Sequence, residues 1–249
     1  MNRIFANKLQ LSLFLCLSMC LGIGILRFSY TALLPSTRLT YGWDYNFASI
    51  LSSANLLGYL IGAFWAMKLP QTPNMTRYIQ LGAILGAISL FSCAFSGFHE
   101  SWYVVWRVIS GISGGLLMIL SPSVVAQCCH PEDRLSINFI GFSGIGIGVL
   151  LATLFMPYLD QISTQTAWLI LTAFATAICL YLCYLLSIFK AFLHEIPTQN
   201  NLLIENKGMY LSLLIVYACS AFAYVPHSLF WIDYLKNTLH LNFYFINCN

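Results

Sequence analysis

Long, nearly uninterrupted runs of apolar residues, separated by short polar segments, dominate this chain of 249 residues. A helix that crosses a bilayer needs about 20 mostly apolar residues at about 1.5 Å each, because the hydrocarbon core is roughly 30 Å thick. Strands of a membrane barrel would be shorter and would alternate apolar with polar residues. The pattern therefore predicts transmembrane helices, in seven runs near residues 10–34, 46–67, 78–98, 102–124, 136–158, 167–190 and 209–232.

The composition excludes a soluble domain. Hydrophobic residues make up 59% of the chain, charged residues 8%, and the mean hydropathy is +0.77. A soluble domain carries roughly 25% charged residues, so this chain cannot build a water-exposed surface over its whole length. We predict an all-α fold, a polytopic membrane helix bundle with the lipid bilayer as its first partner and no nucleic-acid partner.

The lysines and arginines predict the orientation in the membrane, because cytoplasmic loops carry an excess of both. Seven of them fall at the N-terminus or in the second, fourth and sixth loops: Arg3, Lys8, Lys68, Arg77, Arg134, Lys190 and Lys207. The first, third and fifth loops contain only Arg38. We expect a cytoplasmic N-terminus, in the inner membrane of a bacterium. A cleaved leader is the alternative for the N-terminus, but the apolar run continues to Leu34 and favours a retained helix.

The loop over residues 191–208 is the longest and most polar one. Six predicted helices precede it and one follows. We therefore predict an N-terminal six-helix transmembrane bundle over residues 1–190 and a cytoplasmic linker over 191–208. Residues 209–249 would be the first helix of an incomplete C-terminal half plus a tail.

The nine cysteines give no clear sign of a metal or disulfide site. The pairs Cys16/Cys20 and Cys179/Cys183 are four residues apart, so each pair shares one helix face. No CxxC motif occurs, and no histidine lies at ligand spacing. Cysteine as a small apolar packing residue is the favoured interpretation, with metal binding and disulfides as alternatives. We expect no metal, no cofactor and no catalytic residue.

Two arginines lie inside apolar runs, in the half of the bilayer away from the N-terminus. Arg27 is in the first run and Arg107 in the fourth. An arginine inside the bilayer costs roughly 2.5–3.5 kcal/mol on insertion scales, so each is expected to face a partner or a water-filled cavity. The alternative is snorkelling to the surface, which is easier for Arg107 because Trp102 and Trp106 lie beside it.

Polar side chains recur near these arginines at helical spacing. Tyr30 and Thr31 follow Arg27 on one predicted helix face, and Asn55 and Tyr59 form a polar stripe in the second helix. We predict that these residues, with the arginines, line a solute cavity. Hydrogen bonding between helices alone is the alternative.

Two titratable residues belong to the predicted seventh helix, near its outer end. His227 and Asp233 are predicted in its outer part, whereas the acidic residues of the first six runs all fall in loops or at their edges. If protons drive the protein, these two residues are the best-placed groups to carry them. The alternative for Asp233 is simple solvation at the membrane surface.

Glycines at helical spacing predict tightly packed helices, because small residues let two backbones approach closely. They occur in the second, fourth and fifth runs: Gly58, Gly62, Gly111, Gly114, Gly115, Gly141, Gly144 and Gly148. A phosphate-binding loop is excluded, because these glycines lie inside apolar spans rather than between a strand and a helix.

Six helices, a polar linker and a seventh helix resemble the layout of the major facilitator superfamily. The segment RVISGISGG (107–115) is similar to the RxxxGxxxG signature of the superfamily's fourth helix. GIGILRFSYTALLP (22–35), SSANLLGYLIGA (52–63) and YVPHSLFWIDYL (224–235) resemble the first, second and seventh helices of its YbfB/YjiJ branch. The likeness covers nearly all of residues 10–236.

This resemblance implies two six-helix halves around a central cavity, and secondary active transport by alternating access. Arg27 and Arg107 would then attract a small polar or anionic solute. The resemblance also implies that Asp233 pairs with Arg27 near an outer gate. The chain departs from the family in the loop 68–77, which lacks the acidic and Gly-Arg gating motif, and in stopping after the seventh helix. We therefore expect a truncated transporter.

Other functions stay open. A truncated chain could be a non-functional fragment, and a channel is a further alternative. Gly141-Phe-Ser143-Gly144 resembles the GxSG nucleophile motif of rhomboid intramembrane serine proteases, and Trp106-Arg107 resembles their WR pair. A serine nucleophile needs a base within hydrogen-bond reach, and the AHxxG motif that supplies it is missing. A transporter is therefore the favoured function, and an enzyme is not expected.

Overall fold

The computed structural model describes residues 6–69, 74–160, 163–193, 208, 211–213, 215–220 and 223. The chain divides into two compact units, Met1–Thr198 and Gln199–Asn249, and the division falls within the predicted linker. The described part of the second unit contains helical pieces within Leu211–Ser220. Most of the remaining predicted seventh helix lies outside the described residues, and so do His227 and Asp233.

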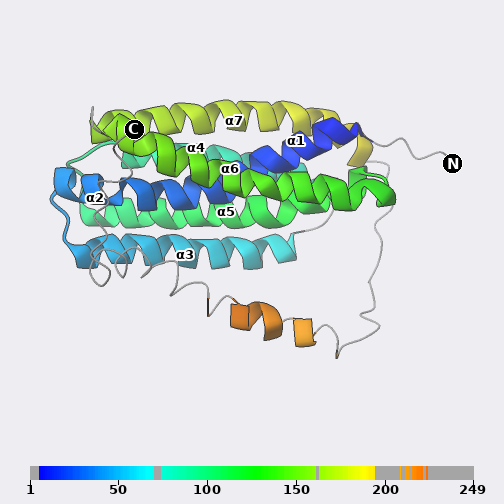
Figure 1. Ribbon diagram of the computed structural model, residues 1–249, viewed down its shortest axis with the longest axis horizontal. Helices are drawn as coiled ribbons and strands as arrows, with labels where there is room; N and C mark the ends of the chain where they lie inside the picture. Colours follow the sequence, from blue (N-terminus) through cyan, green and yellow to red (C-terminus); the bar gives the residue numbers. More distant parts are fainter. Residues whose placement is uncertain are drawn as a thin grey trace. The chain divides into compact units, whose positions relative to one another are not determined.

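Long helices joined by short turns form the first unit (Figure 1). In chain order they are α1 Lys8–Met19, the π-helical segment η1 Cys20–Phe28, α2 Ser29–Tyr41, α3 Tyr45–Lys68, α4 Asn74–Cys93, α5 Glu100–Cys128, the single turn η2 Pro131–Asp133, α6 Arg134–Asp160 and α7 Thr164–Leu193. The described residues contain no strand, so the all-α prediction is confirmed for them. By length and composition, five described segments can cross a membrane: Lys8–Leu34, Tyr45–Met67, Glu100–Cys128, Pro131–Leu154 and Thr164–Lys190. The prediction of a multi-pass helical membrane protein therefore agrees with the structure.

Two predicted helix ends are wrong. The first helix continues seven residues beyond Leu34 and ends at Tyr41, where Gly42 adopts a left-handed conformation with φ 71°. Glycine is the usual residue at such an end, because it has no Cβ to clash there. The third predicted run ends at Cys93 rather than at residue 98, ahead of the turn at Gly97, where φ is 96°. Hydropathy located the apolar stretch, but local turn chemistry sets the helix ends.

The helices run alternately up and down, so the bundle has two ends. One end holds the start of α1 and the α5–α6 turn, which the Lys8–Asp133 salt bridge joins at 2.7 Å. The other end holds the α2–α3 turn at Trp43, and the Tyr41 hydroxyl there donates to the Cys93 carbonyl at 3.2 Å. We call these the Lys8 end and the Trp43 end. The α5–α6 turn, which is the fourth loop of the sequence, thus lies at the same end as the start of α1, and the cytoplasmic location of this end stays a prediction.

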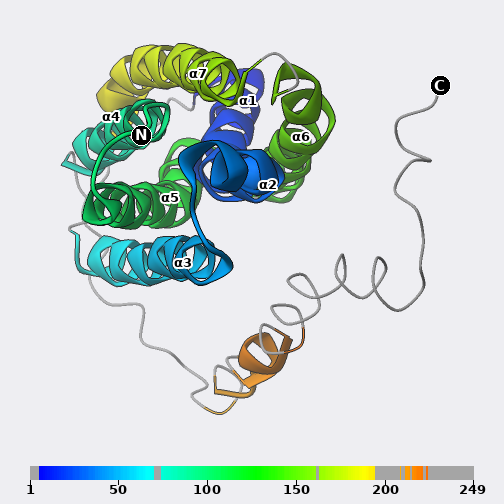
Figure 2. The same cartoon turned by 90° about the vertical axis from the view of Figure 1, so that its left-hand side faces the viewer.

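α5 packs between α3 and α4 and also contacts η1 (Figure 2). α1 and η1 pack against α6, while α4 packs between α5 and α7. α2 contacts both α3 and α6, and Figure 2 places it away from α4. The first long helix, made of α1, η1 and α2, therefore contacts α5 and α6 along its length, and its α2 part also contacts α3.

Glycines make these contacts close. A Cβ added to Gly58 or Gly62 of α3 would fall on the carbonyl oxygens of Val108 or Ile112 in α5. On the facing side, Gly111 and Gly115 lie against α3, and Gly114 lies against the Gly22 carbonyl of η1. In the second interface, Gly141, Gly144 and Gly148 of α6 lie against Leu15, Cys16 and Gly24. All eight glycines predicted to pack helices thus lie at helix contacts.

Candidate functional site

The six predicted cavity residues that the structure describes fall into two groups. Tyr30, Asn55 and Arg107 are buried, whereas Arg27 and Tyr59 are half-buried and Thr31 is exposed. The sequence predicted that Arg27, Tyr30 and Thr31 share one face, but Tyr30 turns into the bundle. The reason is local: η1 ends at Phe28, between Arg27 and Tyr30, and its wider turns shift the register of the helix.

Arg107 lies inside the bundle with only 3% of its surface exposed. Its Nη1 donates to the Leu26 carbonyl oxygen at 3.3 Å, and its guanidinium carbon lies 4.2 Å from the centre of the Tyr30 ring. A cation over an aromatic ring contributes about 2 kcal/mol when it is shielded from water. The Nε atom has no hydrogen-bond acceptor among the described residues. The side chain is thus held by a backbone oxygen and a ring.

Snorkelling of Arg107 is therefore excluded, and an aromatic cluster explains why. Tyr41, Trp43, Phe47 and Tyr103 pack together at the Trp43 end, with ring centres 4.8–5.9 Å apart. Tyr103 lies one helical turn from Arg107, and its hydroxyl donates to the Phe95 carbonyl at 2.7 Å. This cluster lies between the guanidinium and the end of the bundle, so the side chain bonds inward instead.

The other two buried residues fasten neighbouring helices. The Tyr30 hydroxyl donates to the Ala48 carbonyl of α3 at 3.2 Å. The Asn55 side-chain amide donates to the Arg107 carbonyl of α5, also at 3.2 Å. For Asn55, hydrogen bonding between helices therefore accounts for its polar character. The structure brings Tyr30, Asn55 and Arg107 together as one connected set.

Arg27 has different surroundings from Arg107. It is half-buried in the last turn of η1, with its guanidinium carbon 5.4 Å from the centre of its neighbour Phe28. It also lies within electrostatic range of the Tyr59 hydroxyl on α3. Thr31 follows one turn later and is exposed. Arg27, Thr31 and Tyr59 are thus partly or fully accessible groups on η1, α2 and α3, and we call them the Arg27 region.

Neither arginine has an acidic partner in the described part of the chain. The one salt bridge found there joins Lys8 and Asp133, whose side chains are 50% and 39% exposed. The predicted pairing of Arg27 with Asp233 stays a prediction, because Asp233 lies outside the described residues. Within the described residues, then, an accessible arginine inside a membrane span has its charge uncompensated by a carboxylate.

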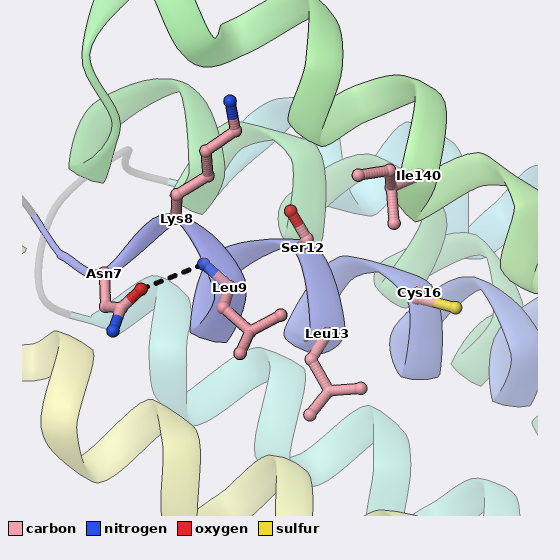
Figure 3. Close-up of a pocket in the computed structure, with 7 residues that line it drawn as sticks. All are labelled: Asn7, Lys8, Leu9, Ser12, Leu13, Cys16 and Ile140. Carbon is pink, nitrogen blue, oxygen red and sulfur yellow. Dashed lines mark hydrogen bonds between the residues drawn. The ribbon is translucent and has the colours of Figure 1, made fainter.

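A groove of about 430 Å³ opens elsewhere, at the Lys8 end (Figure 3). The residues that line it are Asn7, Lys8, Leu9, Ser12, Leu13 and Cys16 of the first helix and Ile140 of α6. Its surface is mostly apolar. None of the six described cavity residues contributes to it, and about 16 Å of helix separate Cys16 from Arg27 at 1.5 Å per residue. The groove and the Arg27 region are therefore different features.

The cysteines and Ser143, which could serve a metal site or a serine protease, show no sign of either role among the described residues. The eight described cysteines are free thiols, and no group of three potential metal ligands occurs among the described residues. Ser143 donates its hydroxyl to the Ile140 carbonyl of its own helix at 2.6 Å. Trp106 and Arg107 belong to α5, where Arg107 bonds to η1.

Two groups of the site escaped sequence reasoning. One is the Leu26 carbonyl, which accepts hydrogen bonds from Arg107 and, at 3.2 Å, from the Ser110 hydroxyl. Its position as an acceptor depends on the π-helical backbone of η1, which no sequence pattern predicts. The other is Ser110 itself, which lies three residues after Arg107 and hence on the same helix face. That spacing could have identified it.

Comparison with known proteins gives two matches. The model of the family described as "Uncharacterised MFS-type transporter YbfB" matches residues 19–243. The chain is also similar to a protein named "Probable anion transporter 3, chloroplastic" from Oryza sativa subsp. japonica, at 24% identity over 127 residues. That alignment covers 51% of this chain but only 24% of the rice protein, so the similar region spans about a quarter of that relative.

Proposed function

This chain belongs to the YbfB family of MFS-type transporters, and we propose that its Arg27 region binds a small anionic solute during secondary active transport. The family is one of multi-pass membrane transporters, which agrees with the five segments able to cross a membrane. The solute and the mechanism go beyond the family match, and the next paragraphs give the reasons for them.

One observation carries the choice of an anion. Arg27 is a cation inside a membrane span, half-buried, with no carboxylate partner among the residues described. Such a charge is costly in the bilayer and usually marks a solute or ion pathway. Arginine also presents a planar set of donors that matches carboxylate or phosphate oxygens in pairs. An anion would supply the missing opposite charge.

The neighbouring groups suit the same ligand. The Tyr59 and Thr31 hydroxyls can donate to further oxygens of an anion that Arg27 holds. Arg107 does not take part directly in this proposal, because it is buried and already bonded to Leu26 and Tyr30. The rice relative, by its name, is a probable anion transporter, and its partial similarity supports the same solute class.

Transport by alternating access is part of the proposal. In this architecture the solute site lies near the middle of the membrane, between two halves that rock against each other. We place the N-terminus and the Lys8 end in the cytoplasm of a bacterium, following the lysine and arginine bias. Protons are the proposed coupling ion, with His227 and Asp233 as the proposed titrating groups.

A binding assay on the purified chain in lipid nanodiscs tests the solute class. The probes are radiolabelled phosphate, sulfate and succinate, with glucose as a neutral control and choline as a cationic one. We expect saturable binding of at least one anion, with no binding of glucose or choline. Binding of choline or glucose with no anion bound would contradict the proposal.

A further inference from the structure

We propose that Arg107 and Ser110 are positioning residues, which hold the Leu26 carbonyl and thereby fix the place of the adjacent Arg27 guanidinium. The inference rests on the proposed function, in which Arg27 binds the anion. It assigns to the buried arginine a task different from contact with the solute.

The contact itself is double. The Leu26 carbonyl oxygen accepts from Arg107 Nη1 at 3.3 Å and from Ser110 Oγ at 3.2 Å. Both donors lie on one face of α5, and both side chains are buried. Two donors from one helix thus meet a single backbone oxygen of another helix, away from water.

The backbone at Leu26 is irregular. Leu26 belongs to η1, a π-helical stretch of nine residues inside an otherwise α-helical segment. π-Helical turns are rare and often mark functional positions. In a membrane, irregular backbone persists where neighbouring side chains satisfy its polar groups. Donors from α5 at Leu26, two residues before η1 ends, therefore stabilise the place where the helix returns to α geometry.

Arg27 lies inside this stabilised turn. It follows Leu26 directly, so any change of the helical register at Leu26 rotates the Arg27 side chain around the helix axis. Arg107 is itself held in place. Its guanidinium lies over the Tyr30 ring, and its backbone carbonyl accepts a hydrogen bond from the Asn55 amide. The buried set thus determines which way the accessible arginine points.

A purely structural role would give a different result. If Arg107 and Ser110 only fastened two helices, their loss would lower stability and leave the affinity of the folded protein for the anion unchanged. Positioning predicts a loss of affinity beyond the loss of stability. The two possibilities therefore separate when affinity and unfolding temperature are measured on the same variants.

Two serines of α5 provide a matched pair for the experiment. Ser110 and Ser113 are both buried, but the Ser113 hydroxyl donates within its own helix, to the Ile109 carbonyl at 2.9 Å. Ser110→Ala therefore removes a contact to η1, and Ser113→Ala removes a bond that never leaves α5. Each variant loses one hydroxyl, so their unfolding temperatures should fall by similar amounts.

The measurements are hydrogen–deuterium exchange of peptides covering residues 20–33, and nanodisc binding of labelled phosphate and succinate. A hydrogen bond contributes about 0.5–1.5 kcal/mol, or about 2- to 12-fold in an equilibrium. We expect Ser110→Ala to raise exchange in η1 and to weaken anion binding within that range, and Ser113→Ala to leave both unchanged. If Ser110→Ala fails to fold, Ser110→Cys keeps the size with a weaker donor and should give a smaller effect of the same sign.

Unchanged exchange and unchanged affinity in the Ser110 variant would overturn the inference. Equal losses of affinity in both serine variants would also overturn it, because they would reflect general loosening of α5. If η1 loosens in the Ser110 variant but the unaltered protein binds none of the anions, the proposed function fails. The positioning role then fails with it, while the contact of α5 with Leu26 stands.

Discussion

The side-chain amide of Asn55 in α3 donates a hydrogen bond to the backbone carbonyl of Arg107 in α5, at 3.2 Å. The bond is buried at the interface where Gly58 and Gly111 let the two backbones approach closely. Because the Arg107 side chain also donates to the Leu26 carbonyl, this bond links the α3–α5 interface to the contact between α5 and η1.

Asn55→Ala should destabilise the bundle. Hydrogen bonds between membrane helices contribute about 0.6 kcal/mol on average and up to about 1.7 kcal/mol. We expect a loss near the upper value, because the Arg107 carbonyl keeps no partner from α3. Thermal unfolding in detergent measures it, with Asn46→Ala as the control, since Asn46 is exposed on the same helix. Equal effects of the two substitutions would contradict this role of Asn55.

Two glycines of α6 should respond differently to the same methyl group. A Cβ on Gly144 would fall on the Cys16 carbonyl, whereas nothing lies within 4 Å of a Cβ on Gly146. Overpacking costs typically about 1–3 kcal/mol, and alanine favours an open helix position by about 1 kcal/mol over glycine. We therefore expect Gly144→Ala to lower the unfolding temperature and Gly146→Ala to leave it unchanged or raise it. A reversed order would refute the α1–α6 packing described above.

Cys129 should react with maleimide more slowly than a solvent-exposed cysteine whose thiol has an ordinary pKa. It follows the membrane span of α5, and burial raises the pKa of its thiol above the ordinary value of 9.0, against the opposing effect of the Arg134 guanidinium. Because the thiolate is the reactive form, labelling should be slow near pH 8 and should keep rising with pH beyond pH 9, where an ordinary thiol begins to level off.

Mass spectrometry of labelled protein over a pH series checks this, in a Cys128→Ser background that removes the adjacent thiol. Arg134→Gln should raise the pKa of Cys129 further and slow the reaction at each pH. Faster labelling in that variant would contradict the assigned effect of Arg134.

Much of the fold was predictable because hydropathy reports directly on the membrane. The helices α1 to α7 each overlap a predicted run, and the predicted glycines lie at the contacts. The end of the first helix was not predictable from hydropathy, since Gly42 rather than the apolar boundary at Leu34 terminates it. A helix can continue through polar residues once it is packed against neighbours.

The site was predictable only as a set of polar side chains. Sequence reasoning placed both Arg27 and Arg107 in the solute cavity, because both are arginines at similar depth in the membrane. Their separation into an accessible and a buried residue depends on the π-helical turn between Cys20 and Phe28 and on the aromatic cluster near Tyr103. Neither feature follows from the pattern of apolar and polar residues along the chain.

Anion binding by paired arginine variants tests the central claim most directly. Arg27→Gln and Arg38→Gln each remove one guanidinium from the first long helix, and both arginines are half-buried. Arg38, however, lies in the last turn of α2, over the Tyr45 ring at 4.0 Å. In nanodiscs with labelled phosphate, sulfate and succinate, we expect Arg27→Gln to abolish binding and Arg38→Gln to retain it. Retained binding in the Arg27 variant would contradict the account.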